Sequence, residues 1–290
     1  MRVFNIIVAA ICLLIIGGGI VAFALQHKYR NQIETPQSSQ SSYKVTNTWK
    51  MPGKLKEISG ISWLSDSKIA CIEDEDGVIF IYDLNENKIK EEITFGDSGD
   101  YEAITINKTD AYVMRSDGVI FEIKNFQDKD LKTSKIETVF SSKNDMESLF
   151  YDFKNDQLIT VCKYKDLSFE NYKGLYAIPL KTKQLNPTPI LKLHMKDKAL
   201  KEFQKKKLYK TFYPSDIAIH PKTEQYYILD GRNTTLMLLS QTGKIEKVIE
   251  LDEDEFPQPE GLTFSPDGKL YISTEGRKHK AAIMEVEIKK

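Results

Sequence analysis

The chain has 290 residues, of which 41% are hydrophobic and 29% are charged, so it is long enough for one large folded domain or two small ones. Its 41 basic residues balance its 42 acidic residues, and the net charge of −1 excludes the strong positive field of a dedicated nucleic-acid-binding protein. Three cysteines are too few for a disulfide framework. Cys12 lies in an apolar segment, and we interpret Cys71 and Cys162, within predicted strands, as small buried hydrophobic residues.

The N-terminal part of the chain contains an uncharged segment. After a short tail at residues 1–5, residues 6–25 read IIVAAICLLIIGGGIVAFAL, and twenty helical residues are long enough to cross a bilayer core. The run exceeds the usual apolar region of a signal peptide, which favours an uncleaved transmembrane anchor. The A-F-A sequence at residues 22–24 leaves a cleaved signal peptide as the alternative, and both interpretations export the rest of the chain. Residues 26–42 are polar and aperiodic, which predicts a flexible linker.

From Tyr43 onward the apolar residues alternate with a period of two, and the pattern repeats. The first copy contains the runs ISGISWL, IACIE, VIFIYDL and IKEEITF, separated by turn sequences rich in Asp, Asn, Ser and Gly. Successive copies open 43, 45, 68 and 45 residues apart. A period near 45 with four β-rich runs is typical of a propeller blade. The opening positions are Ser59, Glu102, Glu147, Ser215 and Glu260.

The two ends of this repeat complement each other. The last copy stops at Lys290 one strand short, whereas residues 43–51 form a predicted strand with no partner before it. We therefore expect the N-terminal strand to complete the last blade, which would close the ring and remove exposed edges. The prediction is an all-β fold, a single propeller of about five four-stranded blades at residues 43–290. Six blades are the alternative if a degenerate blade lies between Gly174 and Tyr213.

The long interval between the third and fourth openings contains a lysine-rich insertion at residues 192–210. Eight lysines accompany the apolar residues Leu193, Leu200, Phe203 and Leu208, whose spacing predicts a short amphipathic helix packed on the ring. In this interpretation the lysines lie on the solvent-exposed face of the helix. The alternative is a patch that contacts anionic lipid or an acidic protein.

Three of the blade openings are glutamates, and these define the first candidate site. The first strand of each propeller blade lines the central channel, so Glu102, Glu147 and Glu260 are expected at its mouth. Converging carboxylates repel one another unless a metal ion or a basic side chain lies among them. Oxygen ligands suit Ca²⁺, which makes the three residues candidate Ca²⁺ ligands. Pairing with basic side chains of the rim is the alternative.

Charged residues at the ends of the second strands define the second candidate site. They predict a rim of mixed sign around the channel mouth that either pairs internally or binds a small ligand. The chain lacks the G-x-S-x-G, H-E-x-x-H and Walker A motifs, so catalytic residues stay unassigned. The predicted rim residues are Glu73, Arg115, Lys163, Asp230, Arg232, Glu275 and Arg277.

Four segments carry a resemblance to a known family. GDYEAI at 99–104, NDMESL at 144–149, PSDIAIHP at 214–221 and PEGLTFSPDGKLYISTEG at 259–276, behind an N-terminal apolar segment, resemble the SdiA-regulated family, also called YjiK/CarP-like. The resemblance covers residues 45–290. It implies a bacterial β-propeller of the cell envelope linked to calcium responses, similar in architecture to propeller phytases and phytase-like esterases. It marks the three glutamates as blade-opening acids, and the chain departs from that pattern at Ser59 and Ser215.

Three functions follow as hypotheses. The leading one is a propeller tethered to the bacterial cell membrane on its extracytoplasmic side, which binds Ca²⁺ or a small ligand at the channel mouth in a sensory role. The second is a Ca²⁺-dependent hydrolase of phosphoesters or carboxylic esters, in which the basic rim residues neutralise the substrate. The third is a protein-interaction scaffold that uses the lysine-rich insertion.

Overall fold

The computed structural model describes residues 42–167, 171–276 and 280–289. Residues Tyr43–Lys290 form one compact unit. The predicted N-terminal tail (1–5), the apolar segment (6–25) and the linker (26–42), apart from Ser42, lie outside the described residues. None of the helices within the described ranges has the length and hydrophobicity needed to cross a membrane.

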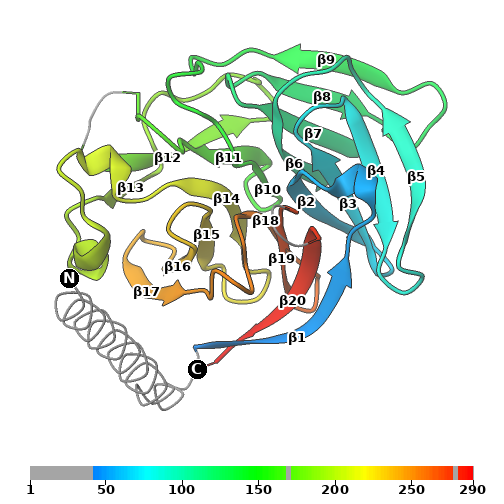
Figure 1. Ribbon diagram of the computed structural model, residues 1–290. Helices are drawn as coiled ribbons and strands as arrows, with labels where there is room; N and C mark the ends of the chain where they lie inside the picture. The colour runs from blue at the N-terminus through cyan, green and yellow to red at the C-terminus, as the bar shows by residue number, and fades with distance from the viewer. Residues whose placement is uncertain (1–41, 168–170, 277–279, 290) are drawn as a thin grey trace, which may run out of the picture. The chain divides into compact units, whose positions relative to one another are not determined.

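The described residues contain twenty strands in five antiparallel sheets of four strands each, arranged as a ring (Figure 1). The first strand of each sheet lies near the centre of the ring in Figure 1. The five-blade prediction is confirmed, because the range 174–213 holds parts of the third blade and two short 3-10 turns. The first sheet contains β2 (Ile58–Ser65), β3 (Lys68–Glu73), β4 (Val78–Asp83) and β5 (Lys88–Thr94). The second contains β6 (Tyr101–Asn107), β7 (Asp110–Arg115), β8 (Ile120–Lys124) and β9 (Lys132–Ile136).

The remaining three sheets follow the same plan. The third contains β10 (Phe150–Asp152), β11 (Gln157–Val161), β12 (Tyr172–Pro179) and β13 (Leu191–His194). The fourth contains β14 (Pro214–Ile219), β15 (Tyr226–Asp230), β16 (Thr235–Leu239) and β17 (Ile245–Glu250). The last contains β18 (Pro259–Phe264), β19 (Leu270–Thr274), β20 (Ala282–Ile288) and β1 (Tyr43–Lys50).

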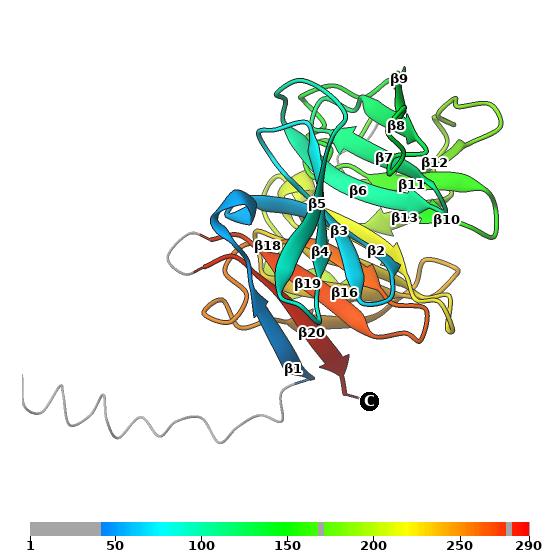
Figure 2. The ribbon, with the colours of Figure 1, turned by 90° about the vertical axis from the view of Figure 1, so that its right-hand side faces the viewer.

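The ring is closed by the N-terminal strand, as predicted. β1 pairs antiparallel with β20, from Tyr43 opposite Ile288 to Lys50 opposite Ala282, and Figure 2 shows the two strands side by side. The Tyr43 ring packs edge-to-face on Phe256, with centroids 5.6 Å apart, and its hydroxyl donates a 2.8 Å hydrogen bond to Glu255. Residues from both ends of the sequence therefore build one blade, which leaves no open sheet edge at the junction.

The hydrophobic core is divided among the interfaces between neighbouring sheets. At the interface of the first two sheets, Phe95, Tyr101 and Phe121 form an edge-to-face cluster with centroids 5.0 to 5.8 Å apart. Cys71 and Cys162 are fully buried, which confirms their interpretation as small hydrophobic residues. Burial also raises the pKa of both thiols, so neither is a ready nucleophile at neutral pH.

Each first strand is interrupted by a β-bulge at the opening position of its blade. The pairing shifts by one residue around Ser59, Glu102, Ser215 and Glu260. The third blade repeats the shift around Glu147, because Met146 and Phe150 lie opposite Cys162 and Ile159. A bulge re-aims the side chain of the extra residue, and in this fold it does so at the channel mouth.

Neighbouring first strands approach each other closely just after the bulge. A Cβ atom added to Gly60 would lie 2.9 Å from the Cα of Ala103, and one added to Gly261 would lie 2.9 Å from the nitrogen of Ile61. Both distances are shorter than real side chains tolerate. Glycine is therefore required where these strands converge.

The lysine-rich insertion does not form the predicted amphipathic helix. Its first residues, in β13, pair with β12, and two short 3-10 turns follow, η2 (Lys198–Phe203) and η3 (Leu208–Lys210). Asp197 accepts a hydrogen bond from the backbone of Ala199 and so begins η2. Leu193 and Leu200 are buried as expected, because apolar residues with helical spacing can also be buried from a strand and a turn. Seven of the eight lysines are exposed, namely Lys192, Lys196, Lys198, Lys201, Lys205, Lys206 and Lys207.

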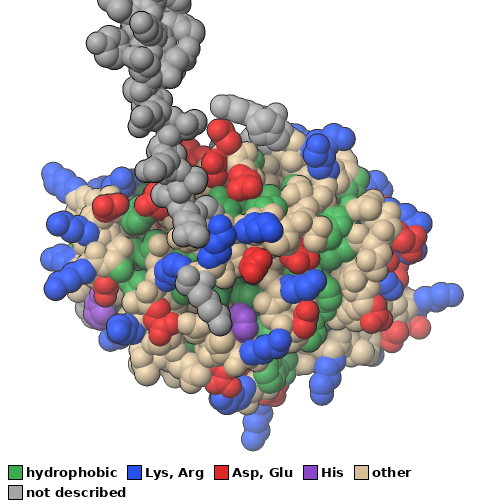
Figure 3. Space-filling model, turned by 90° about the horizontal axis from the view of Figure 1, so that it is seen from below, with side chains coloured by type: hydrophobic (Ala, Val, Ile, Leu, Met, Phe, Trp, Pro, Cys, Tyr) green, Lys and Arg blue, Asp and Glu red, His purple; other side chains and the backbone are tan. Residues whose placement is uncertain are grey.

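The surface carries both signs of charge. Figure 3 shows lysine and arginine side chains interspersed with acidic ones over one face of the molecule. Exposed ion pairs such as Lys54 with Glu92 and Lys154 with Glu224 contribute to this mixture. Such pairs contribute only about 0 to 1 kcal/mol each to stability. The net charge led us to expect no nucleic-acid partner, and this expectation remains a prediction.

Candidate functional site

The three blade-opening glutamates share their site with one lysine. Glu102 opens β6, Glu260 opens β18, and Glu147 precedes β10; only 5% of Glu147 and 6% of Glu260 are exposed. Lys163 follows β11, and its ammonium group forms an ion pair with Oε1 of Glu147. The charges of Glu260 and Glu102 also act on this ammonium group. Pairing of a blade-opening glutamate with a basic rim residue, which the sequence left open as an alternative, is thus present between Glu147 and Lys163.

The pKa values of the cluster reflect burial and mutual repulsion. Burial lowers the pKa of Lys163, but the surrounding carboxylates outweigh this effect and raise it above its usual value. Burial raises the pKa of Glu102 and of Glu147 well above the usual range, and repulsion from Glu260 adds to both shifts. Among the described residues, the buried Oε2 atom of Glu147 has no hydrogen-bond partner. The cluster thus holds more acceptor capacity than Lys163 alone fills.

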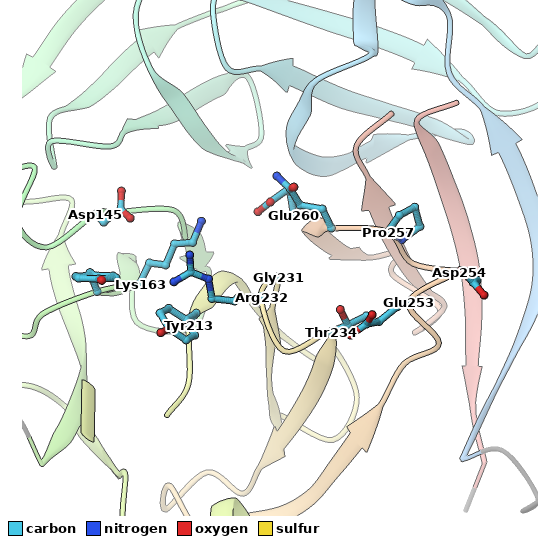
Figure 4. Close-up of a pocket in the computed structure, with 12 residues that line it drawn as sticks. Asp145, Lys163, Tyr213, Gly231, Arg232, Thr234, Glu253, Asp254, Pro257 and Glu260 are labelled. Atoms are coloured by element: carbon cyan, nitrogen blue, oxygen red, sulfur yellow. The ribbon is translucent and has the colours of Figure 1, made fainter. Parts of the chain in front are cut away.

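Two members of this cluster, Lys163 and Glu260, line a cavity of about 560 Å³. Figure 4 shows the side chains of Lys163 and Arg232 next to each other, facing Glu260 across the cavity. The Arg232 guanidinium lies 4.7 Å from the centre of the Tyr213 ring, a cation–π arrangement that orients it. The lining includes Asp145, Tyr164, Glu253 and Asp254.

The insertion packs against Tyr164, which lines this cavity. Tyr209 of η3 packs against Tyr164, with ring centroids 5.2 Å apart, and the ammonium group of Lys210 lies 5.6 Å from the centre of the Tyr164 ring. Tyr213, which follows the insertion, lies 6.1 Å from Tyr164. Aromatic rings and cations therefore alternate along this edge, which suits anionic or planar ligand groups.

A buried lysine holds the loop that carries Lys163 and Tyr164. Lys173 of β12 is fully buried, and its ammonium group donates to the carbonyls of Cys162 (3.0 Å), Lys163 (2.8 Å) and Tyr164 (2.6 Å). Burial lowers the pKa of Lys173 to about 8. We interpret it as a positioning residue, because it fixes the backbone of two residues that line the cavity.

Asp230 plays the corresponding role for Arg232. Its buried carboxylate accepts hydrogen bonds from the backbone of Tyr213 (2.9 Å), Arg232 (3.0 Å) and Asn233 (2.8 Å), and from the Asn233 side chain (2.7 Å). These bonds fix the turn after β15. They also place Tyr213 directly beneath the Arg232 guanidinium.

Of the predicted rim residues that the structure describes, Lys163 and Arg232 alone line the cavity. Glu73 turns back to accept hydrogen bonds from the backbone of Glu75 and Asp76, and Asp230 stabilises a turn in the same way. Arg115 forms a 2.7 Å salt bridge with Asp117. Glu275 follows β19 outside the cavity lining, and Arg277 lies outside the described residues.

The two serine openings have a structural role. Ser59 donates a 2.7 Å hydrogen bond to the carbonyl of Tyr101, and Ser215 donates a 3.0 Å bond to the carbonyl of Pro259. In each case the acceptor directly precedes the opening glutamate of the next blade. The serines therefore tie neighbouring first strands together at the two openings that carry no acid.

Asp216, next to Ser215, is a further buried acid at the centre of the ring. It accepts hydrogen bonds from the backbone of Ile217 (2.8 Å) and Leu262 (2.7 Å). Burial raises its pKa well above the usual range. Because its two oxygens accept backbone donors from β14 and β18, Asp216 links the fourth and last blades.

Sequence reasoning missed Tyr164, Tyr213, Lys173 and Asp145 as parts of the site. Tyr213 and Asp145 stand two residues before the openings Ser215 and Glu147, so position relative to the opening was a usable signal. Nothing in the sequence indicated the buried role of Lys173, since a lysine within a strand ordinarily points to solvent.

The cluster fits a bound Ca²⁺ ion poorly as it is arranged. The Lys163 ammonium group already occupies an oxygen of Glu147, and a second cation beside it would be repelled. Within the described ranges, no group of three or more His, Cys, Asp or Glu side chains has an arrangement that would hold a metal ion. The assignment of Glu102, Glu147 and Glu260 as Ca²⁺ ligands stays a prediction.

A second cavity, of about 640 Å³, lies between the fourth and last sheets. His220, Tyr227 and Phe264 line it and pack on one another, with Phe264 5.0 Å from each of the other two rings. Its lining is more apolar, and these aromatic contacts extend the core between the two sheets. The cavity at the channel mouth is the better candidate for a functional site.

The closed ring of five four-stranded blades, with a charged cavity at the channel mouth, defines the chain as a five-bladed β-propeller. Residues 37–278 match the profile of the SdiA-regulated family, which covers most of the chain. The protein belongs to the SdiA-regulated family, and the resemblance in its sequence motifs is confirmed. Among curated proteins, none matches the chain significantly.

Several solved structures resemble the propeller. Glutaminyl cyclase from Myxococcus xanthus has 11% identity and a TM-score of 0.57, over 84% of this chain and 95% of that chain. A luciferin-regenerating enzyme has 12% identity and a TM-score of 0.54, over 83% and 94%. The PQQ-bound aldose sugar dehydrogenase from Streptomyces coelicolor has 13% identity and a TM-score of 0.51, over 85% and 98%. At these identities the likeness shows the fold alone.

Proposed function

We propose that the protein is a binding propeller that recognises a small anionic ligand in the cavity at the channel mouth. The observation that carries the proposal is the environment of Arg232. Its guanidinium lines the cavity, lies over Tyr213 and forms no salt bridge within the described part of the chain. A preoriented guanidinium without a carboxylate partner is suited to a carboxylate or phosphate group.

The other lining residues complete this recognition. Lys163 lies beside Arg232 and adds a second cation, whereas Glu260 offers an acceptor to a hydroxyl or ammonium group of the same ligand. A volume of about 560 Å³ is within the usual range for small-molecule sites. The ligand that fits best is a small polar molecule with one anionic end.

Binding is favoured over hydrolysis by the chemistry of the lining. Hydrolysis of an ester requires a nucleophile activated by a base, or an acid and a base on either side of the bond. The described lining contains Thr234, two tyrosines and four carboxylates but no His, Cys or Ser, so it holds potential acids and bases without a nucleophile of the usual kind. We therefore place the sensory role ahead of the hydrolase and the scaffold.

The test is a ligand panel with matched variants. Thermal unfolding of the full chain is followed with inorganic phosphate, succinate, glutamate and phytate, and the best binder is titrated by calorimetry. Arg232→Met is expected to weaken its binding by about tenfold or more, the loss of one charge-assisted contact. Arg115→Met, whose guanidinium is paired with Asp117 outside the cavity, is the control. Equal effects of the two substitutions, or no stabilisation by any anion, would contradict the proposal.

We further propose that residues 6–25 anchor the protein in the bacterial cell membrane, with the propeller on the extracytoplasmic side. The uncharged length of this segment supports the proposal. Full-length protein should remain in the membrane fraction after a carbonate wash, and the propeller should be accessible to protease added outside the cytoplasmic membrane. Release by carbonate would contradict anchoring, and protection from external protease would contradict the orientation.

A further inference from the structure

We infer that the end of the lysine-rich insertion forms a second anion subsite beside Arg232, so that the site takes a short chain of linked phosphate groups. This inference rests on the function proposed above and names the chemical class of its ligand. The first phosphate of the chain binds at Arg232, and the next binds at Lys210 of the insertion.

Three tyrosines form a continuous aromatic cluster that connects the cavity to the insertion. The ring of Tyr164 is at its centre, with centroids 5.2 Å from Tyr209 and 6.1 Å from Tyr213. Tyr164 and Tyr213 line the cavity, whereas Tyr209 belongs to η3. A ligand that extends from the cavity along this cluster therefore reaches the insertion.

A cation lies over each ring of the cluster. The three pairs, with the distance from the charged group to the ring centre, are Arg232 over Tyr213 (4.7 Å), Lys210 over Tyr164 (5.6 Å) and Lys165 over Tyr209 (5.7 Å). An aromatic face orients a cation without neutralising its charge. Within the described part of the chain, none of these three cations forms a salt bridge with a carboxylate. Their charges are therefore available to an anionic ligand.

The end of the insertion is attached to the turn that carries Arg232. Thr211, directly after η3, is fully buried, and its carbonyl accepts a 3.1 Å hydrogen bond from the side chain of Asn233. Lys210 and Arg232 are the chain neighbours of these two residues. The hydrogen bond therefore holds the segments that carry the two cations next to each other.

The hydroxyl of Tyr164 marks the place where the cations of the two segments act together. The neighbouring Lys210 ammonium group lowers the pKa of Tyr164, and the charges of Arg232 and Lys207 act in the same direction. Tyr164 also lines the cavity. A phosphate group beside this hydroxyl can accept its hydrogen bond and contact a cation from each segment.

The acids of the cavity direct an anionic chain toward the insertion. Of the four acids in the described lining, three lie in Figure 4 on the opposite side from Lys163, namely Glu253, Asp254 and Glu260. The fourth, Asp145, lies on the side of Lys163. A chain of negative charges that begins at Arg232 is therefore repelled by the opposite wall and attracted by the cations of the insertion.

Linked phosphates suit this series of cations. The guanidinium of Arg232 presents a planar fork, which fits the oxygens of a terminal phosphate. Lysines bind phosphate as compact point charges, so they accept the following groups of a chain from several directions. The lysine-rich insertion thus extends the site that Arg232 begins.

The experiment compares phosphate, pyrophosphate and tripolyphosphate as ligands. Each is titrated by calorimetry, in metal-depleted buffer, into full-length wild type, Lys210→Met and Arg232→Met. Wild type is expected to bind tripolyphosphate about tenfold or more tighter than phosphate, the gain from one further charge-assisted contact. Lys210→Met should remove most of this difference, whereas Arg232→Met should weaken the binding of all three probes.

A lysine on another blade provides the matched control. Lys135 also lies over an aromatic ring, 5.3 Å from the centre of Phe121, but it belongs to β9, the outer strand of the second sheet. Lys135→Met removes the same charge and should keep the wild-type ratio of the tripolyphosphate and phosphate affinities. If Lys210→Met does not fold, Lys210→Gln, which removes the charge but keeps a polar side chain, replaces it.

Three results would overturn the inference and leave the proposed function in place. The first is Arg232-dependent binding of phosphate that becomes no tighter in tripolyphosphate, and the second is a ratio of affinities that Lys210→Met leaves at the wild-type value. The third is Arg232-dependent binding of succinate without binding of any phosphate probe. If no anion binds in an Arg232-dependent way, the proposed function is wrong and the inference fails with it.

Discussion

Asp230→Asn tests whether buried acids at strand ends shape the cavity. In the native turn, Oδ1 of Asp230 accepts the backbone N–H groups of Arg232 and Asn233. Oδ2 accepts the backbone N–H of Tyr213 and the side-chain amide of Asn233. An asparagine has one oxygen and one NH₂ group, so either orientation of its amide places a donor against two donors.

The magnitude follows from these contacts. Two hydrogen bonds are lost, and an unsatisfied buried donor costs about 1 to 3 kcal/mol. The Asn233 amide keeps its 3.1 Å hydrogen bond to the carbonyl of Thr211, so losing its bond to residue 230 costs less free energy than losing the backbone bond. Burial raises the pKa of Asp230, which means that the ionised carboxylate carries a desolvation cost that asparagine avoids. We expect a net destabilisation of about 2 kcal/mol.

Urea denaturation followed by circular dichroism at pH 7 measures the difference in unfolding free energy. Asp254→Asn is the control, since Asp254 lines the same cavity but is exposed, and it should change the free energy by less than about 0.5 kcal/mol. Equal free energies for the two variants would refute the reasoning. They would mean that Asp230 is protonated in the native state and that asparagine reproduces its bonds.

Three further predictions address the ring itself. Burial lowers the pKa of Lys173 to about 8, so the unfolded chain holds one more proton than the folded protein between pH 8 and 10.5. In urea denaturation, the unfolding free energy of wild type should therefore rise by about 2 kcal/mol relative to that of Lys173→Met between pH 7 and 9.5. An equal pH dependence of the two proteins would contradict this prediction. Ser215→Ala should cost about 1 kcal/mol because the buried carbonyl of Pro259 loses its donor, and an unchanged midpoint of thermal unfolding would argue against this link. Deleting Tyr43–Lys50 exposes the edge of β20 and should cause concentration-dependent association in size-exclusion chromatography; a monomer as stable as wild type would show that closure is dispensable.

The fold could be predicted from local patterns because a propeller repeats them. A period-two alternation and turn residues at regular spacing predicted about five blades, with six as the alternative. An unpaired N-terminal strand and a last copy one strand short predicted the closure by β1. The insertion was harder, since Leu193 and Leu200 are buried whether the backbone is helical or extended. Pairing with β12 decides between these alternatives, and a single window of sequence does not contain that information.

The candidate site was predictable in part. The positions of Glu102, Glu147 and Glu260 followed from the repeat alone. Whether an acid at a strand end faces the channel or its own turn depends on which backbone N–H groups lie nearby. Glu73 and Asp230 accept hydrogen bonds from backbone N–H groups of their own turns and leave the rim. Lys163 pairs instead with Glu147, and Arg232 lies over Tyr213, and both line the cavity.

The bulge that opens every first strand makes the side chain at the channel mouth independent of the strand pairing, whereas the two are coupled in an ordinary sheet. Along a regular strand, changing the residue that faces one side constrains the packing on the other, but the extra residue of a bulge adds a side chain without altering the pairing of the strands around it. The five positions around the mouth can therefore accept different side chains, as the present mixture of serine and glutamate illustrates. Selectivity for new ligands can be acquired there one substitution at a time while the blades stay unchanged.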